Sequence, residues 1–396
     1  MKERLLRTLG LRSCVCLLVL GLTSALTGCT GFFVPVDSTG TGTGTGTGSG
    51  STFPVGPDYV FVGNAATMTL SGFLIGSAGT LSNLPDMPYT LGFIPTSMVM
   101  HPSDNFLYVA GASAIYCLAI SSTGSITTSI AQAGVAIVTT TAIDISPDGN
   151  WLFALDATNY QVDVYQINQT TGALTAQTPV SYGLTSAQLS LVQANAVKVA
   201  PSGGLVIAAL GRAGDIVFSL NESTGALVNV TQIPPFPGLT SDNALAMDST
   251  SSYLFIARSG AGFGLAVYSI GSNYALTQLN NGVAYTAGSQ PTTVTLGDSG
   301  KYVYVGNGID GTISGYTIGL GAVLTSLSGS PYASGAQVSA VGGDNSGDFI
   351  LATAYNGNPD LTMYSFDTTI PGKLDVATTA PTGTDPAGAV VMALAH

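Results

Sequence analysis

A unit of about 50 residues recurs along most of the chain, and this repeat restricts the fold more than any other feature. Its clearest copy begins at Gln290 and reads QPTTVTLGDSGKYVYVGNGIDGTISGYTIG; YVFVGN at 59–64 belongs to another copy. Each copy has an apolar stretch, a turn rich in Pro, Asp, Ser and Gly, and alternating strand segments. The first large apolar or aromatic residues after the turns are Tyr59, Phe106, Trp151, Leu205, Tyr253, Tyr302 and Phe349. A second series follows in phase: Phe73, Tyr116, Tyr165, Phe218, Tyr268, Tyr316 and Tyr364.

This period predicts an all-β, seven-bladed β-propeller over residues 58–396. Three or four short strands for every 45 to 50 residues are typical of a propeller blade, and no stretch after the amino terminus shows a sustained helical period. Tyr59 has no inner strand before it, whereas AGAVVMALA at 387–395 has no blade of its own. We therefore expect the C-terminal strand to complete the first blade and close the ring.

The repeats resemble those of the seven-bladed lactonase propellers, which include phosphogluconolactonases, and the wider group of YVTN repeats. Residues 291–307, PTTVTLGDSGKYVYVGN, match well, and 141–155, TAIDISPDGNWLFAL, match partly. The resemblance covers about residues 58–396. It implies the propeller fold and hydrolysis of a sugar lactone, with His, Arg and Glu side chains around the inner rim.

The inner-rim positions of this chain depart from that pattern. They hold Thr96, Ser97, Thr140, Thr141, Ala194, Asn195, Asp242, Asn243, Thr292, Thr293 and Gln337. Only Asp242 among them is ionisable, while lactone hydrolysis needs a general base or metal-bound water and donors for the oxyanion. The sequence therefore favours a module that binds without catalysis, and a lactonase-like hydrolase is the alternative.

The amino terminus has the features of an export signal. Four basic residues in 1–12 precede the short apolar run SCVCLLVLGLTSAL at 13–26, and LTGC at 26–29 resembles the lipobox of bacterial lipoproteins. The resemblance implies cleavage of residues 1–28 and attachment of lipid to Cys29. Residues 29–57 would then be a lipidated Cys and a Thr/Gly-rich tether with a reach of about 30 Å. We expect an exported protein held in the bacterial cell envelope by its lipid alone, at the outer membrane on its periplasmic or surface side.

The charge balance bears on the partners. The chain has 9 basic and 21 acidic residues, and without residues 1–28 it keeps five basic and twenty acidic ones. Nucleic acid and anionic lipid surfaces require clusters of Lys and Arg, so neither is an expected partner. We expect a monomer whose partner is a small anionic molecule or an envelope protein.

Two arginines carry the candidate ligand site. Arg212 in LGRAGD and Arg258 in ARSGAG are expected in the loops between the second and third strands of consecutive blades, near Asp215 and Asp242. The planar guanidinium suits carboxylates and phosphates. The alternative is that both arginines are surface residues paired with these aspartates.

No other residues indicate a catalytic, metal or cofactor site. After residue 29 the chain holds one cysteine, Cys117, in the apolar segment AIYCLAIS, where a buried thiol is expected. His101 and His396 are expected to be solvated and do not suggest a metal site. We therefore assign no catalytic residue, no metal and no cofactor.

Overall fold

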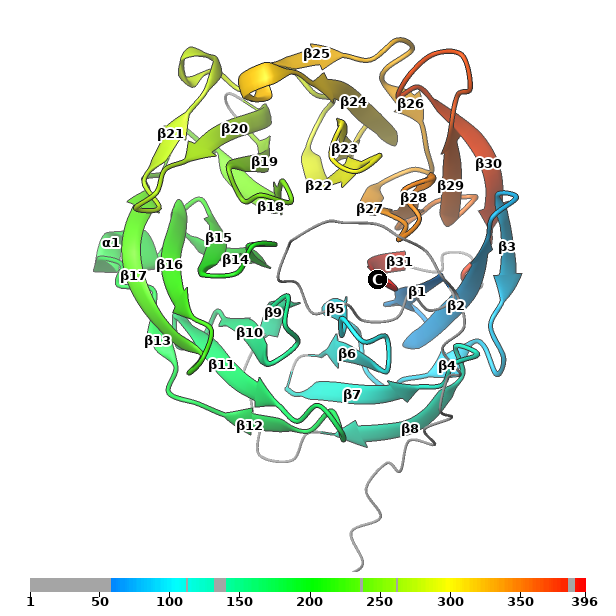
Figure 1. The fold of residues 1–396 in the computed structure, drawn as a ribbon, viewed down its shortest axis with the longest axis horizontal. Coiled ribbons are helices and arrows are strands. Elements are labelled where there is room, and N and C mark those ends of the chain that lie inside the picture. The colour runs from blue at the N-terminus through cyan, green and yellow to red at the C-terminus, as the bar shows by residue number, and fades with distance from the viewer. Residues whose placement is uncertain (1–57, 112, 132–139, 236–237, 261–262, 384–388) are drawn as a thin grey trace, which may run out of the picture.

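The described residues of the computed structural model, 58–111, 113–131, 140–235, 238–260, 263–383 and 389–396, form seven four-stranded antiparallel blades around a central axis (Figure 1). The inner strands are β5 (Ser97–Met100), β9 (Thr140–Ile145), β14 (Val192–Val199), β18 (Ser241–Met247), β22 (Pro291–Gly297), β27 (Val338–Gly343) and β31 (Ala389–Leu394). The second strands are β1 (Tyr59–Asn64), β6 (Phe106–Ala110), β10 (Trp151–Asp156), β15 (Leu205–Gly211), β19 (Tyr253–Ser259), β23 (Tyr302–Asn307) and β28 (Phe349–Ala354).

The two outer layers of each blade complete the sheets. The third strands are β2 (Thr69–Gly76), β7 (Ile115–Ile120), β11 (Gln161–Ile167), β16 (Asp215–Asn221), β20 (Gly264–Ile270), β24 (Thr312–Ile318) and β29 (Leu361–Phe366). The outermost strands are β3 (Thr80–Asn83), β8 (Ile126–Ala131), β12 (Leu174–Ala176), β17 (Ala226–Ile233), β21 (Leu276–Gln278), β25 (Leu324–Ser326) and β30 (Leu374–Ala380). Short strands β4 (Tyr89–Thr90), β13 (Val180–Ser181) and β26 (Tyr332–Ala333) pair with β2, β11 and β24.

Helical structure in the described residues is limited to single turns, which are α1 (Ser186–Leu189) and the 3₁₀ helices η1 (Asn280–Gly282) and η2 (Leu320–Ala322). None of these helices is long and apolar enough to cross a membrane. The predicted signal peptide, Cys29 and the tether lie outside the described residues.

The ring closes as the sequence predicted. The C-terminal strand β31 pairs antiparallel with β1, with Val60 opposite Leu394 and Val62 opposite Met392. The last described residue, His396, also donates its backbone N–H to Asp104 in the next blade, over 2.9 Å. Blade 1 therefore takes its inner strand from the end of the chain and its other strands from the beginning, which leaves no open strand edge at the join.

The core lies between the blades. Among the described residues, seven clusters of buried apolar side chains each combine two neighbouring blades; one unites Phe153 of blade 3 with Phe218 of blade 4. Both aromatic series of the repeat lie on strands, the first on second strands and the other on third strands. The repeated residues therefore supply the contacts that join each blade to the next.

One face of the ring, here called the turn face, carries the turns between inner and second strands and between third and outermost strands. On this face an aromatic side chain of one blade donates its N–H or O–H to a backbone carbonyl of the next blade, in the turn between that blade's third and outermost strands. The pairs are Tyr59 to Ser122 (2.6 Å), Tyr108 to Gly172 (2.8 Å), Trp151 to Glu222 (2.6 Å) and Tyr304 to Gly372 (2.7 Å). Gly225 in such a turn has φ +70° and lies so close that a Cβ would be 2.4 Å from the Trp151 ring. A side chain at this position would push the two blades apart.

Candidate functional site

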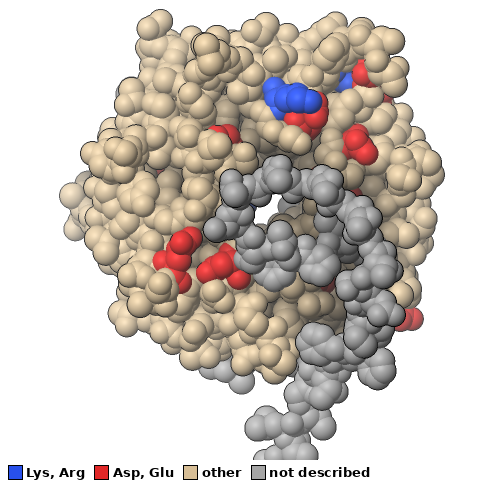
Figure 2. Space-filling view, viewed as in Figure 1, with Lys and Arg blue, Asp and Glu red and all other residues tan. Residues whose placement is uncertain are grey.

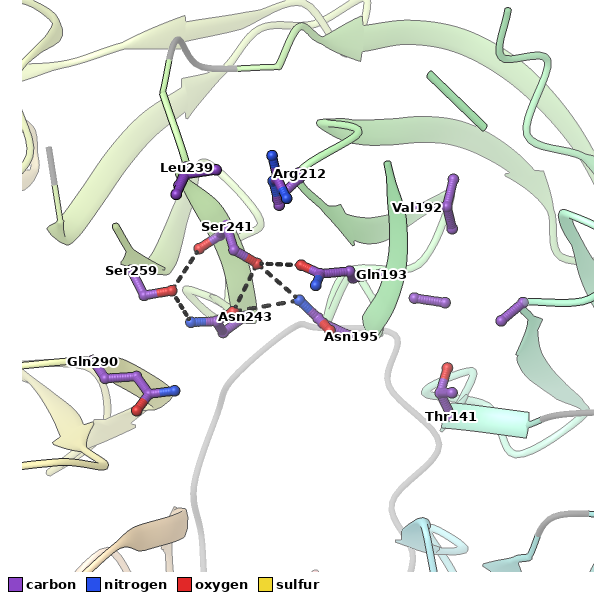
Figure 3. Close-up of a pocket in the computed structure, with 12 residues that line it drawn as sticks. Thr141, Val192, Gln193, Asn195, Arg212, Leu239, Ser241, Asn243, Ser259 and Gln290 are labelled. Atoms are coloured by element: carbon purple, nitrogen blue, oxygen red, sulfur yellow. Dashed lines mark hydrogen bonds between the residues drawn. The ribbon is translucent and has the colours of Figure 1, made fainter. Parts of the chain in front are cut away.

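A cavity of about 560 Å³ opens on the face opposite the turn face, here called the pocket face, where second strands end and inner strands begin (Figure 3). Blades 3, 4 and 5 and the loop before blade 6 supply its walls. It is lined by Thr141, Ala157, Val192, Gln193, Ala194, Asn195, Arg212, Leu239, Ser241, Asn243, Ser259 and Gln290. Its volume lies in the range of small-molecule sites.

Neutral amides and hydroxyls form a connected network along one wall of this pocket (Figure 3). The Ser241 hydroxyl donates to Asn243 Oδ1 over 3.0 Å and lies 3.2 Å from Gln193 Oε1. The amide of Asn243 donates to the Ser259 hydroxyl over 2.9 Å. These contacts hold the polar groups in place before any ligand arrives, which lowers the entropy cost of binding.

Some polar side chains near the starts of the inner strands also form hydrogen bonds between neighbouring blades. Asn195 Nδ2 donates to the Asp242 carbonyl over 2.8 Å, and Asn243 Nδ2 donates to the Pro291 carbonyl over 2.6 Å. Threonines do the same elsewhere in the ring, because Thr96 donates to the Thr140 carbonyl over 2.8 Å. The polar side chains of the inner rim therefore also have a structural role, which was not predicted from the sequence.

Arg212 is the one ionisable residue among the twelve that line the pocket. It is half-buried, and its Nε–H is shielded from solvent and has no hydrogen-bond partner. The four other basic residues within the described ranges form ion pairs with aspartates: Lys198, Arg258, Lys301 and Lys373. Arg212 is the described basic residue without such a pair, although the protein is strongly acidic.

Arg258 has a different environment from the one predicted. It lies within β19 rather than in a loop, and it is 1% exposed. Its Nε and Nη2 donate to the two carboxylate oxygens of Asp242 over 2.5 and 2.8 Å, and Nη2 also lies 3.4 Å from the Tyr268 hydroxyl. Burial alone would lower the pKa of Arg258, but the hydrogen bonds to Asp242 raise it. Arg258 is therefore neither a surface residue nor a residue open to a ligand.

Asp215 lies beside this ion pair, where Gly211 pairs with Asp242 across blades 4 and 5. Its side chain is fully buried, close to Asp242 and Arg258. Burial first, and then the negative charge of Asp242, raise the pKa of Asp215 well above its usual range. Its surroundings therefore favour the protonated, neutral form of this carboxyl over the charged form.

The four predicted ligand residues thus divide into two sites. Arg212 reaches the pocket, while Arg258, Asp215 and Asp242 form a buried cluster behind it, and none of those three lines the cavity. The pocket residues Gln193, Leu239, Ser259 and Gln290 were missed. They lie at strand ends and in loops where the repeat is weakest, and no motif marks them.

His101 contradicts the expectation that both histidines are solvated, whereas His396 is exposed. The imidazole of His101 is fully buried on the turn face; Nδ1 accepts from the Ser103 backbone N–H over 3.1 Å, and Nε2–H donates to the Gly149 carbonyl over 3.1 Å. Burial lowers the pKa of His101. The thiol of Cys117 is buried, as predicted.

The pocket lining is mostly polar and uncharged. Its lining offers hydrogen-bond donors and acceptors and one guanidinium, but no carboxylate, imidazole, thiol or amine. Across the described ranges, no three His, Cys, Asp or Glu side chains lie close enough to hold a metal ion. Figure 2 shows that charged side chains are also sparse on the face it presents.

Known proteins resemble this chain mainly in fold. The family described as "Lactonase, 7-bladed beta-propeller" matches residues 77–184. A search of curated proteins found no match. Among solved structures, a putative 6-phosphogluconolactonase from Bacteroides uniformis has 13% identity and a TM-score of 0.70, covering 85% of this chain and 99% of that one.

Two further structures show how widely the fold is used. The periplasmic gluconolactonase of Pseudomonas aeruginosa has 15% identity and a TM-score of 0.67, with coverage of 86% and 99%. Hydrazine synthase of Kuenenia stuttgartiensis has 16% identity and a TM-score of 0.52, with coverage of 83% and 100%. At these identities the likeness shows the propeller fold alone, since one fold carries many activities.

Proposed function

We propose that this protein is a lipid-anchored, extracytoplasmic binding module whose pocket takes a small anionic molecule with hydroxyl or carbonyl groups. The observation that carries the proposal is Arg212, a basic residue without an ion pair in an acidic protein, at the wall of a polar pocket. A ligand carboxylate would complete its hydrogen bonding, and the neighbouring amides and hydroxyls would bind the rest of the molecule.

Electrostatics supports an anionic ligand. The guanidinium of Arg212 is partly buried and has no counter-ion among the described residues. Binding of an anion therefore stabilises it by more free energy than it would stabilise a guanidinium that is already paired with an aspartate. A charge-assisted hydrogen bond contributes about 1.5–3 kcal/mol, which corresponds to roughly ten- to hundredfold in affinity. Arg212 is the one cation of this pocket, and a single guanidinium can pair with one carboxylate. A phosphate is a less suitable ligand, because phosphate sites commonly combine several donors or positive charges.

Hydrolysis of a sugar lactone is the second candidate. It is favoured by the family match over residues 77–184 and by the similarity in fold to a gluconolactonase and a putative 6-phosphogluconolactonase. The pocket lining lacks a general base, however, and Arg212 alone cannot activate a water molecule.

A protein of the cell envelope is the alternative partner if no small molecule binds.

The first described residue and the pocket lie on opposite faces of the ring. Asp58 precedes β1 at the turn face, where the Tyr59 carbonyl accepts from the Ala395 backbone N–H over 2.9 Å. The described part of the chain therefore begins on the face opposite the pocket.

Calorimetry on the full-length protein in non-ionic detergent tests the proposal. Gluconate should bind more tightly than glucose, and Arg212→Gln should weaken gluconate binding roughly ten- to hundredfold. Lys301→Gln is the matched control, because Lys301 is an exposed basic residue on the turn face. Equal binding of gluconate and glucose, or an unaffected Arg212→Gln variant, would count against an anion site.

Two further assays test the hydrolase alternative and the lipid anchor. Hydrolysis of gluconolactone above the uncatalysed rate, abolished in Arg212→Gln, would establish the hydrolase instead. Cys29→Ala should release the protein from the membrane fraction or leave its precursor unprocessed; unchanged fractionation and processing would contradict the lipid anchor.

A further inference from the structure

Three exposed apolar side chains lie in adjacent loops of the pocket face at blade 5. Leu239 is 69% exposed, Phe263 48% and Val283 61%. We call these three residues the apolar ridge. Single exposed apolar residues are normal on protein surfaces, so the question is whether the three belong to one surface.

The loops that carry the ridge are in backbone contact. A Cβ on Gly260 would lie 2.0 Å from the Leu239 carbonyl oxygen, and one on Gly264 would lie 2.0 Å from the Tyr285 carbonyl oxygen. Leu265 and Tyr285 also exchange backbone hydrogen bonds of 2.8 Å. The loop of Leu239 therefore abuts the loop of Phe263, which in turn abuts the segment that follows Val283.

The ridge begins inside the pocket. Leu239 is one of the residues that line the cavity, and Figure 3 shows it beside Arg212 at the same end of the pocket. An exposed apolar side chain and a guanidinium without an ion pair therefore lie next to each other in the pocket lining. The polar network of Ser241, Asn243 and Ser259 lies beyond them.

We propose, resting on the function proposed above, that the ligand is a carboxylic acid with an apolar arm. Its carboxylate binds Arg212 and its polar groups reach the amide and hydroxyl network. The arm leaves the pocket across Leu239 toward Phe263 and Val283. The apolar surface that this arm would bury is now exposed to water, so its length should control affinity.

A series of acetate, butanoate and hexanoate tests this inference by calorimetry on the full-length protein in detergent, with titrations into detergent alone subtracted. Affinity should rise about fourfold for each methylene group that becomes buried. Leu239→Ser should flatten the dependence on chain length, whereas Arg212→Gln should weaken every member by a similar factor. Leu320→Ser is the control, because Leu320 is fully exposed in η2 on the turn face.

The outcomes separate this inference from the function on which it rests. Carboxylates that bind with equal affinity at every chain length would overturn the apolar arm and leave the anion site intact. A chain-length dependence that persists in Leu239→Ser would overturn the placement of the arm. Failure of gluconate and all three alkanoates to bind would overturn the anion site itself.

Discussion

Arg212 and Arg258 lie at corresponding ends of second strands in consecutive blades, yet their environments are opposite. Arg258 is buried and held by both carboxylate oxygens of Asp242, whereas Arg212 faces a pocket and has no ion pair among the described residues. The difference arises from one neighbour. Asp242 lies on the inner strand of the same blade as Arg258, directly opposite it in the sheet.

This comparison shows that a basic residue near a candidate site can bind an anionic ligand only if no acidic side chain is already paired with it. The guanidinium of Arg258 is committed to the interior, so it contributes to stability. The guanidinium of Arg212 is available for a ligand. We therefore expect substitutions at the two arginines to affect different properties of the protein.

The largest expected effect is on stability when Arg258 is replaced. Arg258→Met leaves Asp242 buried without its partner and should lower the free energy of unfolding by about 3–5 kcal/mol. Chemical denaturation of the full-length protein in detergent measures the change. A loss below about 1 kcal/mol would show that the pair is not a buried structural contact.

A double variant sharpens this prediction. Arg258→Met combined with Asp242→Leu removes both charges and should recover much of the stability, because a buried ion pair can often be replaced by apolar residues of similar volume. A double variant as unstable as the single one would mean that lost packing, and not an unpaired charge, causes the damage.

The next effect concerns pH and Asp215. Because its pKa is raised in the folded state, the folded protein holds this proton more tightly than the unfolded chain does. The free energy of unfolding should therefore fall as pH rises above the ordinary carboxyl pKa of about 4, by up to about 1.4 kcal/mol per pH unit. Asp215→Asn stays neutral at every pH and should remove this part of the slope.

The measurement is the difference in unfolding free energy between the wild type and Asp215→Asn at each pH. Asp58, whose pKa is raised to about 7 by burial and by Asp344, and His101, whose pKa is lowered, contribute to both curves and cancel. The charged and titratable groups beside Asp215 are Asp242, Arg258 and Tyr268. A difference that does not vary with pH would contradict a raised pKa of Asp215.

The smallest expected effect is on the stability of an Arg212 variant. Arg212→Gln breaks no ion pair within the described structure, so its free energy of unfolding should stay within about 0.5 kcal/mol of wild type. Lys301→Gln, which removes an exposed pair with Asp298, gives the reference for a surface change. A loss from Arg212→Gln comparable with that from Arg258→Met would erase the distinction between the two arginines.

The repeat made the fold predictable. Tyr59, Trp151 and Tyr302 recur because each fills the seam with the next blade, and Gly225 and Gly372 recur in the turns that these rings touch. A contact that is repeated around a ring leaves a periodic trace in the sequence. The closure of the ring by β31 was predictable from the same repeat, because the first blade has no inner strand before Tyr59 and the C-terminal strand has no blade of its own.

The candidate site was predicted only in part for the opposite reason. The pocket combines residues that differ from blade to blade, such as Gln193, Leu239 and Gln290, so no period reveals them. The loop position of Arg212 indicated the correct face. The burial of Arg258 depends on a cross-strand partner, and that of His101 on its contact with Gly149 in the next blade; neither is visible in local sequence.

The most direct test of this account follows the two arginine Nε–H groups by ¹⁵N NMR during a titration with gluconate. Arg212→Lys and Arg258→Lys spectra would assign the two signals. We expect the Arg212 signal to shift with ligand concentration, because its Nε–H gains an acceptor, while the Arg258 signal, already bonded to Asp242, stays in place. An unmoved Arg212 signal at concentrations where calorimetry detects binding would contradict the claim that Arg212 holds the anion.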